Sequence, residues 1–254
     1  MSRRYWERRV LPGVVMWGRQ VGGSPEHGRI LPDGCLDLVW DGRRLFVAGP
    51  DTSARWHDSA AGTGYVALRF AAGTGAGYLG IRADELRDRL AHLDELWAAA
   101  EARELTERTA ERPATALASW LAARSRAVTP EPLGARVLAM ASVGTPVSAM
   151  ADRLDLGPRR LHRRCQPLFG YGPRHLARVM RMNRALEAAR TGAPMAVVAA
   201  DHGYADQAHL SREVRSLAGA TPSQLVREWA VGVTQPGRNA NRSTGLPSGS
   251  WTTA

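Results

Sequence analysis

Apolar and polar positions alternate along the first half of the chain, which is the pattern of strands that are buried on one face. The alternation is clearest at 35–40 and 65–70. Asp41-Gly42 supplies a hairpin turn after the first of these segments, and a second apolar run at 45–48 leads back. Glycines are frequent here and helix caps are missing. Between Ile30 and Ile81 the sequence therefore predicts a small, mostly antiparallel sheet or barrel.

The period of the apolar residues becomes helical after residue 83. Within the segment 83–126 the residues that recur at this spacing are Leu86, Leu90, Leu93, Leu96 and Trp97, followed by Leu117, Trp120 and Leu121. We expect them to lie on helices that follow the sheet.

Two prolines in close succession, Pro130 and Pro132, interrupt the chain after these helices. Because proline interrupts both helix and sheet hydrogen bonding, we predict a linker at 127–133. It separates an N-terminal sensing or dimerisation domain (1–126) from a helical domain (134–231). The segment 232–254 is mostly Gly, Pro, Ser, Thr and Asn, so we expect a disordered tail there.

The helical domain contains an internal repeat with a spacing of 49 residues. Each copy has a short apolar helix, a tight turn, a longer helix and a Gly-x-x-Pro stop; the copies span 147–173 and 195–222. This is the plan of a helix-turn-helix unit, whose second helix enters the major groove of DNA. The identical positions are Ala151 and Ala200, Asp152 and Asp201, Leu161 and Leu210, Arg163 and Arg212, Leu168 and Leu217, Gly170 and Gly219, and Pro173 and Pro222.

The longer helix of each copy, expected at 158–169 and 207–218, has one apolar face. Leu161, Cys165 and Leu168 should be buried in the first copy, as should Leu210, Val214 and Leu217 in the second. A continuous helical stretch at 174–190 should hold the two units at a fixed separation. The candidate DNA-binding residues are Arg159, His162, Arg163, Gln166, Gln207, Ala208, His209, Ser211, Arg212 and Arg215.

The distribution of charge favours an acidic partner for the second half. The formal net charge is +10, and all 34 basic residues are arginine. Residues 1–129 have a net charge of +2, residues 130–231 have +6, and the remaining residues have +2. The excess of positive charge thus coincides with the predicted helix-turn-helix units, as expected for a nucleic-acid-binding domain.

Three segments of this half resemble the DNA-binding domain of AraC/XylS regulators: 157–164, 181–186 and 201–212, with their Gly-aromatic-x-Asp-Gln turn and closing Gly-x-x-Pro. The resemblance implies an all-α domain in which a linker helix joins two helix-turn-helix units, with double-stranded DNA as the partner. Gly157 stands where the family usually has a capping serine, and Cys165, Leu210 and Val214 stand where phenylalanines are usual, which implies looser packing.

The N-terminal half also resembles part of a known domain, on the segments 31–39 and 47–50. It is similar to the N-terminal domain of a poorly characterised subgroup of these regulators, and no ligand follows from that. The expected fold class is therefore α+β, with a small, mostly antiparallel β domain and trailing helices before the all-α domain.

The candidates for catalytic or metal chemistry are Cys35, His27, His57, Asp33 and Asp37, which could supply a nucleophile with a base or a set of metal ligands. We favour their interpretation as turn, strand and loop residues. No catalytic site, metal or cofactor is expected, and both cysteines should be reduced. The alternatives are a DNA-repair alkyl acceptor that uses Cys35 and a partner-binding protein without a DNA target.

Candidate partners besides DNA are RNA polymerase, a small-molecule effector of unknown identity and a second copy of the chain. Trp17, Trp40, Trp56 and Tyr65 are candidates for lining an effector pocket, although aromatic residues in a small sheet domain more often form its core. The charged N-terminus has no apolar run behind it and no apolar stretch is long enough to span a bilayer. We therefore expect a cytoplasmic protein without membrane contact.

Residues 130–232 alone should fold and bind duplex DNA, because the linker and the repeat delimit a unit of ordinary domain size. Circular dichroism and a mobility-shift assay at low salt would measure the two properties. A soluble, helical fragment without affinity for DNA would contradict the interpretation as two helix-turn-helix units.

Overall fold

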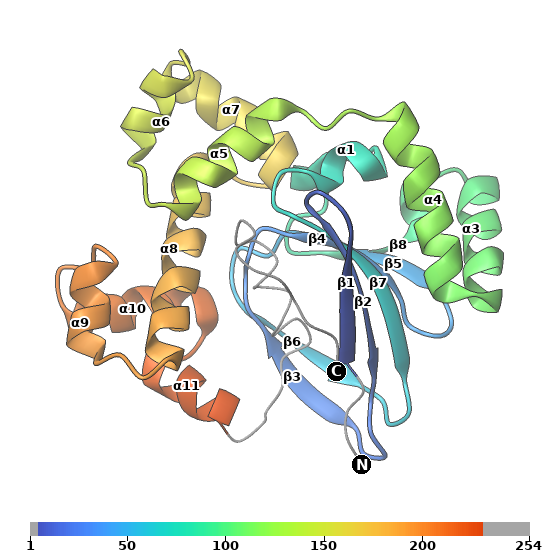
Figure 1. Ribbon diagram of the computed structural model, residues 1–254, viewed down its shortest axis with the longest axis horizontal. Helices are drawn as coiled ribbons and strands as arrows, with labels where there is room; N and C mark the ends of the chain where they lie inside the picture. Colours follow the sequence, from blue (N-terminus) through green and yellow to red (C-terminus); the bar gives the residue numbers. More distant parts are fainter. Residues whose placement is uncertain (1–4, 231–254) are drawn as a thin grey trace.

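Two central strands organise the N-terminal half. The computed structural model describes residues 5–230. β2 (Val14–Gln20) pairs antiparallel with β7 (Gly64–Phe70), and Met16 lies opposite Leu68. Further strands extend the pair into a six-stranded antiparallel sheet in the order β1-β2-β7-β4-β5-β8 (Figure 1). The other strands of the sheet are β1 (Tyr5–Leu11), β4 (Leu36–Trp40), β5 (Leu45–Ala48) and β8 (Leu90–His92).

The alternation along these strands gives the sheet two different faces. On one face Met16, Leu38 and Leu68 are fully buried in a core that helices cover. The other face carries a smaller apolar cluster that includes Trp17 and Val39. A two-stranded antiparallel ribbon, β3 (Glu26–Ile30) with β6 (Arg55–Ser59), lies over this second face.

The helices that follow the sheet close its first face. They are α1 (Gly75–Leu79), the short 3-10 helix η1 (Ala83–Glu85), α2 (Leu93–Leu96), α3 (Ala99–Glu111) and α4 (Pro113–Ala127). A proline at the first position starts α4, where its missing N–H group costs nothing. Leu117, Trp120 and Leu121 of α4 enter the core of the sheet.

The predicted helical character of the segment 83–97 is wrong in part. Leu90–His92 forms strand β8, in which Ala91 lies opposite Val47 of β5. This segment is a strand because its backbone hydrogen-bonds to the open edge of the sheet at β5. The helical spacing of the leucines is accidental there, and Leu90 is 48% exposed. The sequence pattern also missed β1, β2 and β3, because the predicted sheet began only at Ile30, where β3 ends.

The C-terminal half is helical, and the predicted α+β class is confirmed. Its helices are α5 (Pro132–Ser142), α6 (Val147–Arg153), α7 (Pro158–Phe169), α8 (Pro173–Arg190), α9 (Met195–Asp201), α10 (Gln207–Ala218) and α11 (Pro222–Ala230). Helices α6 and α7 form one helix-turn-helix unit and α9 and α10 form the other, with α8 between them (Figure 1). Within residues 5–230, no helix combines the length and apolar character needed to cross a bilayer.

The two halves share part of their core. Leu31 and Ala72 of the N-terminal half belong to the same apolar cluster as α5, α7 and α8. Gly73 and Gly134 bring the backbones of the two halves together, because a Cβ atom on Gly134 would lie 2.5 Å from the carbonyl oxygen of Gly73. The domain limits at 126 and 134 stay a prediction, although α4 ends at Ala127 and α5 begins at Pro132. The predicted tail at 232–254 lies outside the described residues.

The substitution Gly134→Ala should lower the free energy of unfolding by about 1–3 kcal/mol, because the new methyl group forces α5 away from the backbone at Gly73. Gly23→Ala is the matched control, since nothing lies within 4 Å of its Cβ position. Urea unfolding of both variants would measure the difference. Equal stability of Gly134→Ala and the wild type would mean that the two halves do not meet as closely as described.

Candidate nucleic-acid interface

The first long helix, α7, presents a row of basic side chains to solvent. Pro158 begins this helix, and Gly170 ends it in the left-handed conformation at φ +77°. Leu161, Cys165 and Leu168 are buried, as the spacing predicts. The exposed side chains of α7 are Arg159, Arg160, His162, Arg163 and Arg164, and Gln166 is half-buried.

The second long helix, α10, begins at a side-chain cap. Asp206 accepts a hydrogen bond from the backbone N–H group of His209 at 2.6 Å, and Gly219 ends the helix at φ +70°. The predicted row of Leu210, Val214 and Leu217 is buried. The candidate residues Gln207, Ala208, Arg212 and Arg215 are exposed, while His209 and Ser211 are half-buried.

Two of the candidate residues also make contacts inside the protein. The imidazole of His209 accepts a hydrogen bond from the backbone N–H group of Ala205 at 3.2 Å and lies edge-on to Tyr204. The ring of His162 lies directly against Gly172, in the space that a Cβ atom there would occupy. His162 therefore helps to shape the end of the first unit and His209 the turn of the second, which the sequence pattern did not indicate.

Helix α8 holds α5 and the second unit through arginine side chains. Arg184 donates hydrogen bonds to the carbonyl oxygens of Ala141 and Ser142, at 2.9 Å and 2.7 Å, where α5 ends. Arg181 donates to the carbonyl oxygen of Gly203 at 3.3 Å and lies over the ring of Tyr204, 4.4 Å from its centroid. Arg184 thus attaches α8 to α5, the helix that precedes the first unit, and Arg181 attaches α8 to the second unit.

A carboxylate of α10 completes this attachment. Arg178 donates to Glu213 at 3.0 Å, and Arg181 does so at 3.3 Å. Partial burial alone would raise the pKa of Glu213. The hydrogen bond and positive charge of Arg178, together with the charge of Arg181, outweigh this effect, so the pKa lies below its usual 4.5. Glu213 is the one acidic residue of α10, whose other charged residues are arginines. A single negative charge on a basic helix is the sequence signal that could have identified Glu213 as a positioning residue.

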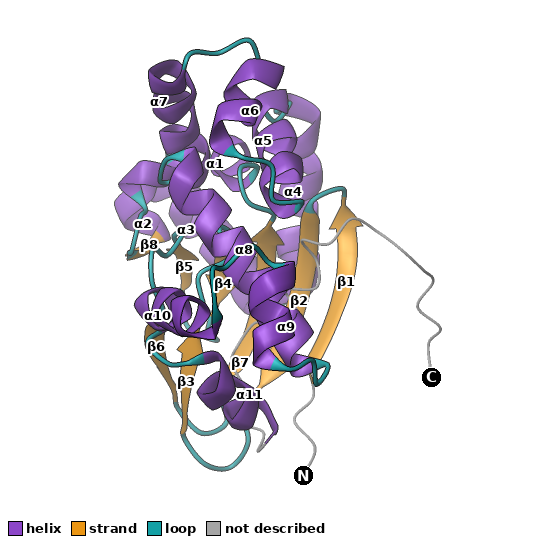
Figure 2. Cartoon of the chain, turned by 90° about the vertical axis from the view of Figure 1, so that its left-hand side faces the viewer, coloured by secondary structure: helices purple, strands orange, loops and turns teal. Residues whose placement is uncertain are grey.

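As a result α7 and α10 lie on the same side of α8. Figure 2 shows both along its left edge, with α6 to the right of α7 and α9 to the right of α10. The exposed side chains of the two helices carry an excess of arginine. A linear acidic polymer on that side could contact both helices together.

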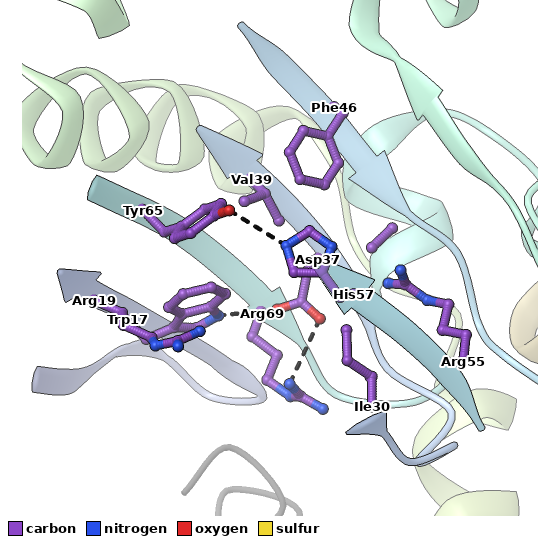
Figure 3. A pocket seen from close by; sticks show the side chains of 11 residues that line it. Trp17, Arg19, Ile30, Asp37, Val39, Phe46, Arg55, His57, Tyr65 and Arg69 are labelled. Atoms are coloured by element: carbon purple, nitrogen blue, oxygen red, sulfur yellow. Dashed lines mark hydrogen bonds and ion pairs between the residues drawn. The ribbon is translucent and has the colours of Figure 1, made fainter. Parts of the chain in front are cut away.

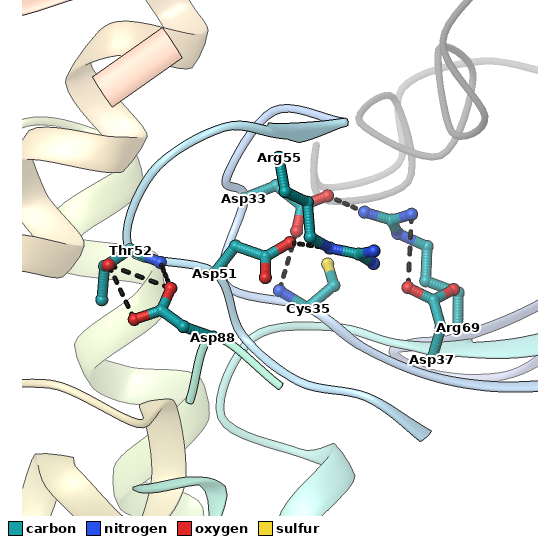
Figure 4. Close-up of polar contacts among 8 residues, drawn as sticks. All are labelled: Asp33, Cys35, Asp37, Asp51, Thr52, Arg55, Arg69 and Asp88. Atoms are coloured by element: carbon teal, nitrogen blue, oxygen red, sulfur yellow. Dashed lines mark hydrogen bonds and ion pairs between the residues drawn. The ribbon is translucent and has the colours of Figure 1, made fainter. Parts of the chain in front are cut away.

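Among the residues considered for catalysis, Cys35 is brought next to Asp33, but the two histidines lie elsewhere. Cys35 is buried, its backbone N–H group donates to Asp33 at 2.9 Å, and burial raises its thiol pKa well above the usual range (Figure 4). His27 and His57 lie instead on the ribbon, in β3 and β6. Within residues 5–230, no group of three acidic, histidine or cysteine residues could hold a metal ion.

The carboxylates of Asp33, Asp37 and Asp51 form ion pairs with arginines of the sheet and the ribbon (Figure 4). Arg69 forms ion pairs with Asp33 and with Asp37, the latter at 3.6 Å. Arg55 donates to Asp51 at 2.9 Å. The network holds the loops that face the helical half.

Of the four aromatic residues considered for an effector pocket, two line one. Trp17 and Tyr65 face a cavity between the sheet and the ribbon (Figure 3). Trp40 lies on the opposite face of the sheet, in the core under the helices, and Trp56 is 52% exposed on the outside of the ribbon. Successive residues of a strand face opposite sides. Trp40 therefore faces away from the pocket that its neighbour Val39 lines, and Trp56 faces away from the pocket that its neighbours Arg55 and His57 line.

The fold and the arrangement of α7 and α10 define a protein of the helix-turn-helix class. Residues 150–228 match a family model described as a helix-turn-helix domain, and residues 4–92 match one described as a domain of unknown function (DUF6597). No curated protein matches the chain. The C-terminal region is an AraC-type helix-turn-helix domain.

Among solved structures, the chain is similar to ToxT of Vibrio cholerae. A ligand-free variant from strain SCE256 is 12% identical, covers 87% of this chain and 99% of its own, and has a TM-score of 0.43. ToxT from strain O395 is 10% identical, with coverages of 89% and 96% and a TM-score of 0.42. At such values the likeness gives no information on mechanism or ligand.

Replacing Glu213 by glutamine should lower the free energy of unfolding at pH 7 by less than about 1 kcal/mol, because the ion pairs are partly exposed. A carboxylate with a lowered pKa stabilises the fold above its unfolded pKa, and that stabilisation is lost as the pH falls through the folded pKa. The difference between Glu213→Gln and wild type should therefore begin to shrink as the pH falls below 4.5 and should vanish only below the lowered pKa of the folded protein. Urea unfolding at several pH values measures it, and a difference that persists in acid would contradict the role of the ion pairs.

Proposed function

We propose that the protein reads two successive major-groove segments of double-stranded DNA, one with α7 and one with α10. The observation that carries this proposal is the placement of both helices on one side of α8 (Figure 2). Arg159, Arg163, Arg212 and Arg215 of these helices are exposed. Major-groove segments on one face of a duplex recur roughly every 10 base pairs. One chain would then bind two boxes.

Arg163 and Arg212 are the proposed base readers. They occupy the same position in the two repeats, and both are exposed without a partner among the ion pairs of the described residues. A guanidinium group can donate two hydrogen bonds to the O6 and N7 atoms of guanine. The proposed flanking base or phosphate contacts are Arg159, His162, Gln166, Gln207, Ala208, His209, Ser211 and Arg215.

Arg164 serves a different purpose in this proposal, because it forms an ion pair with Glu131 just before α5. Its side chain is directed toward the start of the helical half and away from the base-reading face. Arg160 is exposed and would stay near the DNA backbone or in solvent.

The alternative functions receive less support. An alkyl acceptor needs a reactive thiolate, whereas burial disfavours the ionised form of Cys35. A partner-binding protein without a DNA target would leave the repeated arginines of α7 and α10 without a purpose.

We also propose that residues 1–126 sense a signal or form a dimer, and that RNA polymerase is a further partner.

Truncating Arg163 or Arg212 to alanine should weaken operator binding by about 1–3 kcal/mol and relax specificity in one box only. Arg103→Ala, which removes an exposed arginine from α3, is the matched control and should have no such effect. Footprinting on an operator selected from genomic fragments, beside binding to random DNA, measures both quantities. Equal weakening on specific and random DNA would show that these arginines do not read bases.

A further inference from the structure

A short segment of the N-terminal half runs between the ends of α7 and α10. Pro50 packs against the end of α7, because a Cβ atom on Gly170 would lie 2.6 Å from the Cγ atom of Pro50. A few residues further on, the backbone N–H group of Ala54 donates to the carbonyl oxygen of Leu217 in the last turn of α10, at 2.6 Å. Part of the N-terminal half, the segment 50–54, therefore lies between the ends of the two helices.

Arg87 stands beside the segment 50–54 with its side chain exposed. The backbone N–H group of its neighbour Asp88 donates to the carbonyl oxygen of Pro50 at 3.2 Å. The Nη1 atom of Arg87 donates to the carbonyl oxygen of Gly170 at 3.3 Å, and η1, which precedes it, packs against α7. Arg87 thus places a guanidinium group of the N-terminal half at the C-terminal end of α7.

This guanidinium group lies where the outward row of α7 ends. Gly170 continues at helical spacing the row that is formed by Arg159, Arg163 and Gln166. A positive charge beside Gly170 therefore extends the basic surface of α7 by a residue from the other half of the chain.

The carboxylates around Arg87 are used within the protein. These acidic residues are Asp84, Glu85 and Asp88. The first two pair with Arg82, at 2.8 Å and 3.8 Å. The third accepts hydrogen bonds from the backbone N–H group and the hydroxyl group of Thr52, at 2.6 Å and 2.9 Å. The charge of Arg87 is consequently left for a partner outside the protein.

The first turn of α8 adds a second exposed arginine between the two helices. Arg174 lies four residues before Arg178 and therefore on the same stripe of α8. Arg178 reaches Glu213 of α10 at 3.0 Å, so this stripe faces the side on which α10 lies. Burial is the largest cause of the lowered pKa of His175, and the charges of Arg178 and Arg87 add to it, so both arginines lie near this imidazole.

We propose that Arg87 and Arg174 bind phosphate groups of the DNA backbone between the two boxes, so that the N-terminal half itself contacts the operator; this deepens the proposed reading of DNA by α7 and α10 and rests on it. Among the described residues neither arginine forms an ion pair. A guanidinium group and a phosphate have opposite charge and form short, strong hydrogen bonds.

The position of these arginines fits the path of a duplex that spans both helices. Figure 2 shows α2 and β8 of the N-terminal half along the same edge, at a height between α7 and α10. DNA that meets both helices passes this part of the protein with the backbone that separates two major-groove segments. Because phosphates are the same in every sequence, the contacts add affinity and fix the register without reading bases.

The contacts are tested on the full chain by measuring DNA affinity over a range of salt concentrations. Each phosphate contact contributes about 0.9 to the slope of log affinity against log salt concentration. Arg87→Gln and Arg174→Gln should each reduce the slope by about that amount and weaken operator and random DNA by a similar factor. Arg87→Lys should keep the slope, since it keeps the charge, and Arg103→Gln on α3 is the matched control.

An unchanged slope in Arg87→Gln would overturn the contact from the N-terminal half. An unchanged slope in Arg174→Gln would overturn the contact from α8. A slope that falls equally in Arg87→Lys and Arg87→Gln would show that the shape of the side chain matters at this place and its charge does not, and would also overturn the proposal.

Neutral methylphosphonate groups in the DNA separate a phosphate contact from the hold of Arg87 on α7. Placed between the two boxes, they should weaken binding of the wild type by about threefold or more and weaken the double variant Arg87→Gln, Arg174→Gln no further. Equal weakening of both proteins would show that the arginines act through the position of α7 alone. Normal slope changes with a footprint over one box only would instead count against the proposed function and leave the phosphate contacts standing.

Discussion

Arginine side chains that donate hydrogen bonds to the ends of helices are the interaction on which the arrangement of this protein depends. The last carbonyl groups of a helix have no partner within it and carry partial negative charge, so a guanidinium group is suited to them. Such contacts recur at the ends of α1, α5, α6, α7, α9 and α10, where the donors are Arg124, Arg184, Arg136, Arg87, Arg181 and Arg29. All six join segments that lie apart in the sequence.

These contacts give the arginine-only composition a structural meaning besides charge. A lysine offers a single point charge, whereas the guanidinium fork donates from two nitrogens at once, as Arg178 does with Nε and Nη2 to the two carboxylate oxygens of Glu213. The arginines of the helical half consequently fall into two groups. Arg181 and Arg184 attach α8 to the second unit and to α5, and exposed arginines such as Arg163 and Arg212 remain open to a partner.

The attachment of both halves to the same helices makes the N-terminal half part of the DNA-binding geometry. Arg87 reaches the carbonyl oxygen of Gly170 at the end of α7, and Arg29 reaches that of Ala218 at the end of α10. Asn183 of α8 donates to the carbonyl oxygen of Pro32 at 3.2 Å. Each element that sets the separation of the two units therefore also touches the sheet domain, and a change in one half is felt in the other.

The sequence by itself determined both helix-turn-helix units, including the bounds of α7 and α10, the buried row from Leu161 to Leu168, and the exposed positions of Arg163 and Arg212. It could do so because helix periodicity, proline starts and glycine stops act over a few neighbouring residues. Only the tertiary structure decided that Leu90–His92 is a strand, that Trp40 and Trp17 face opposite sides, and that Arg29 meets Ala218. Such pairings join residues far apart in the chain, so no local pattern encodes them.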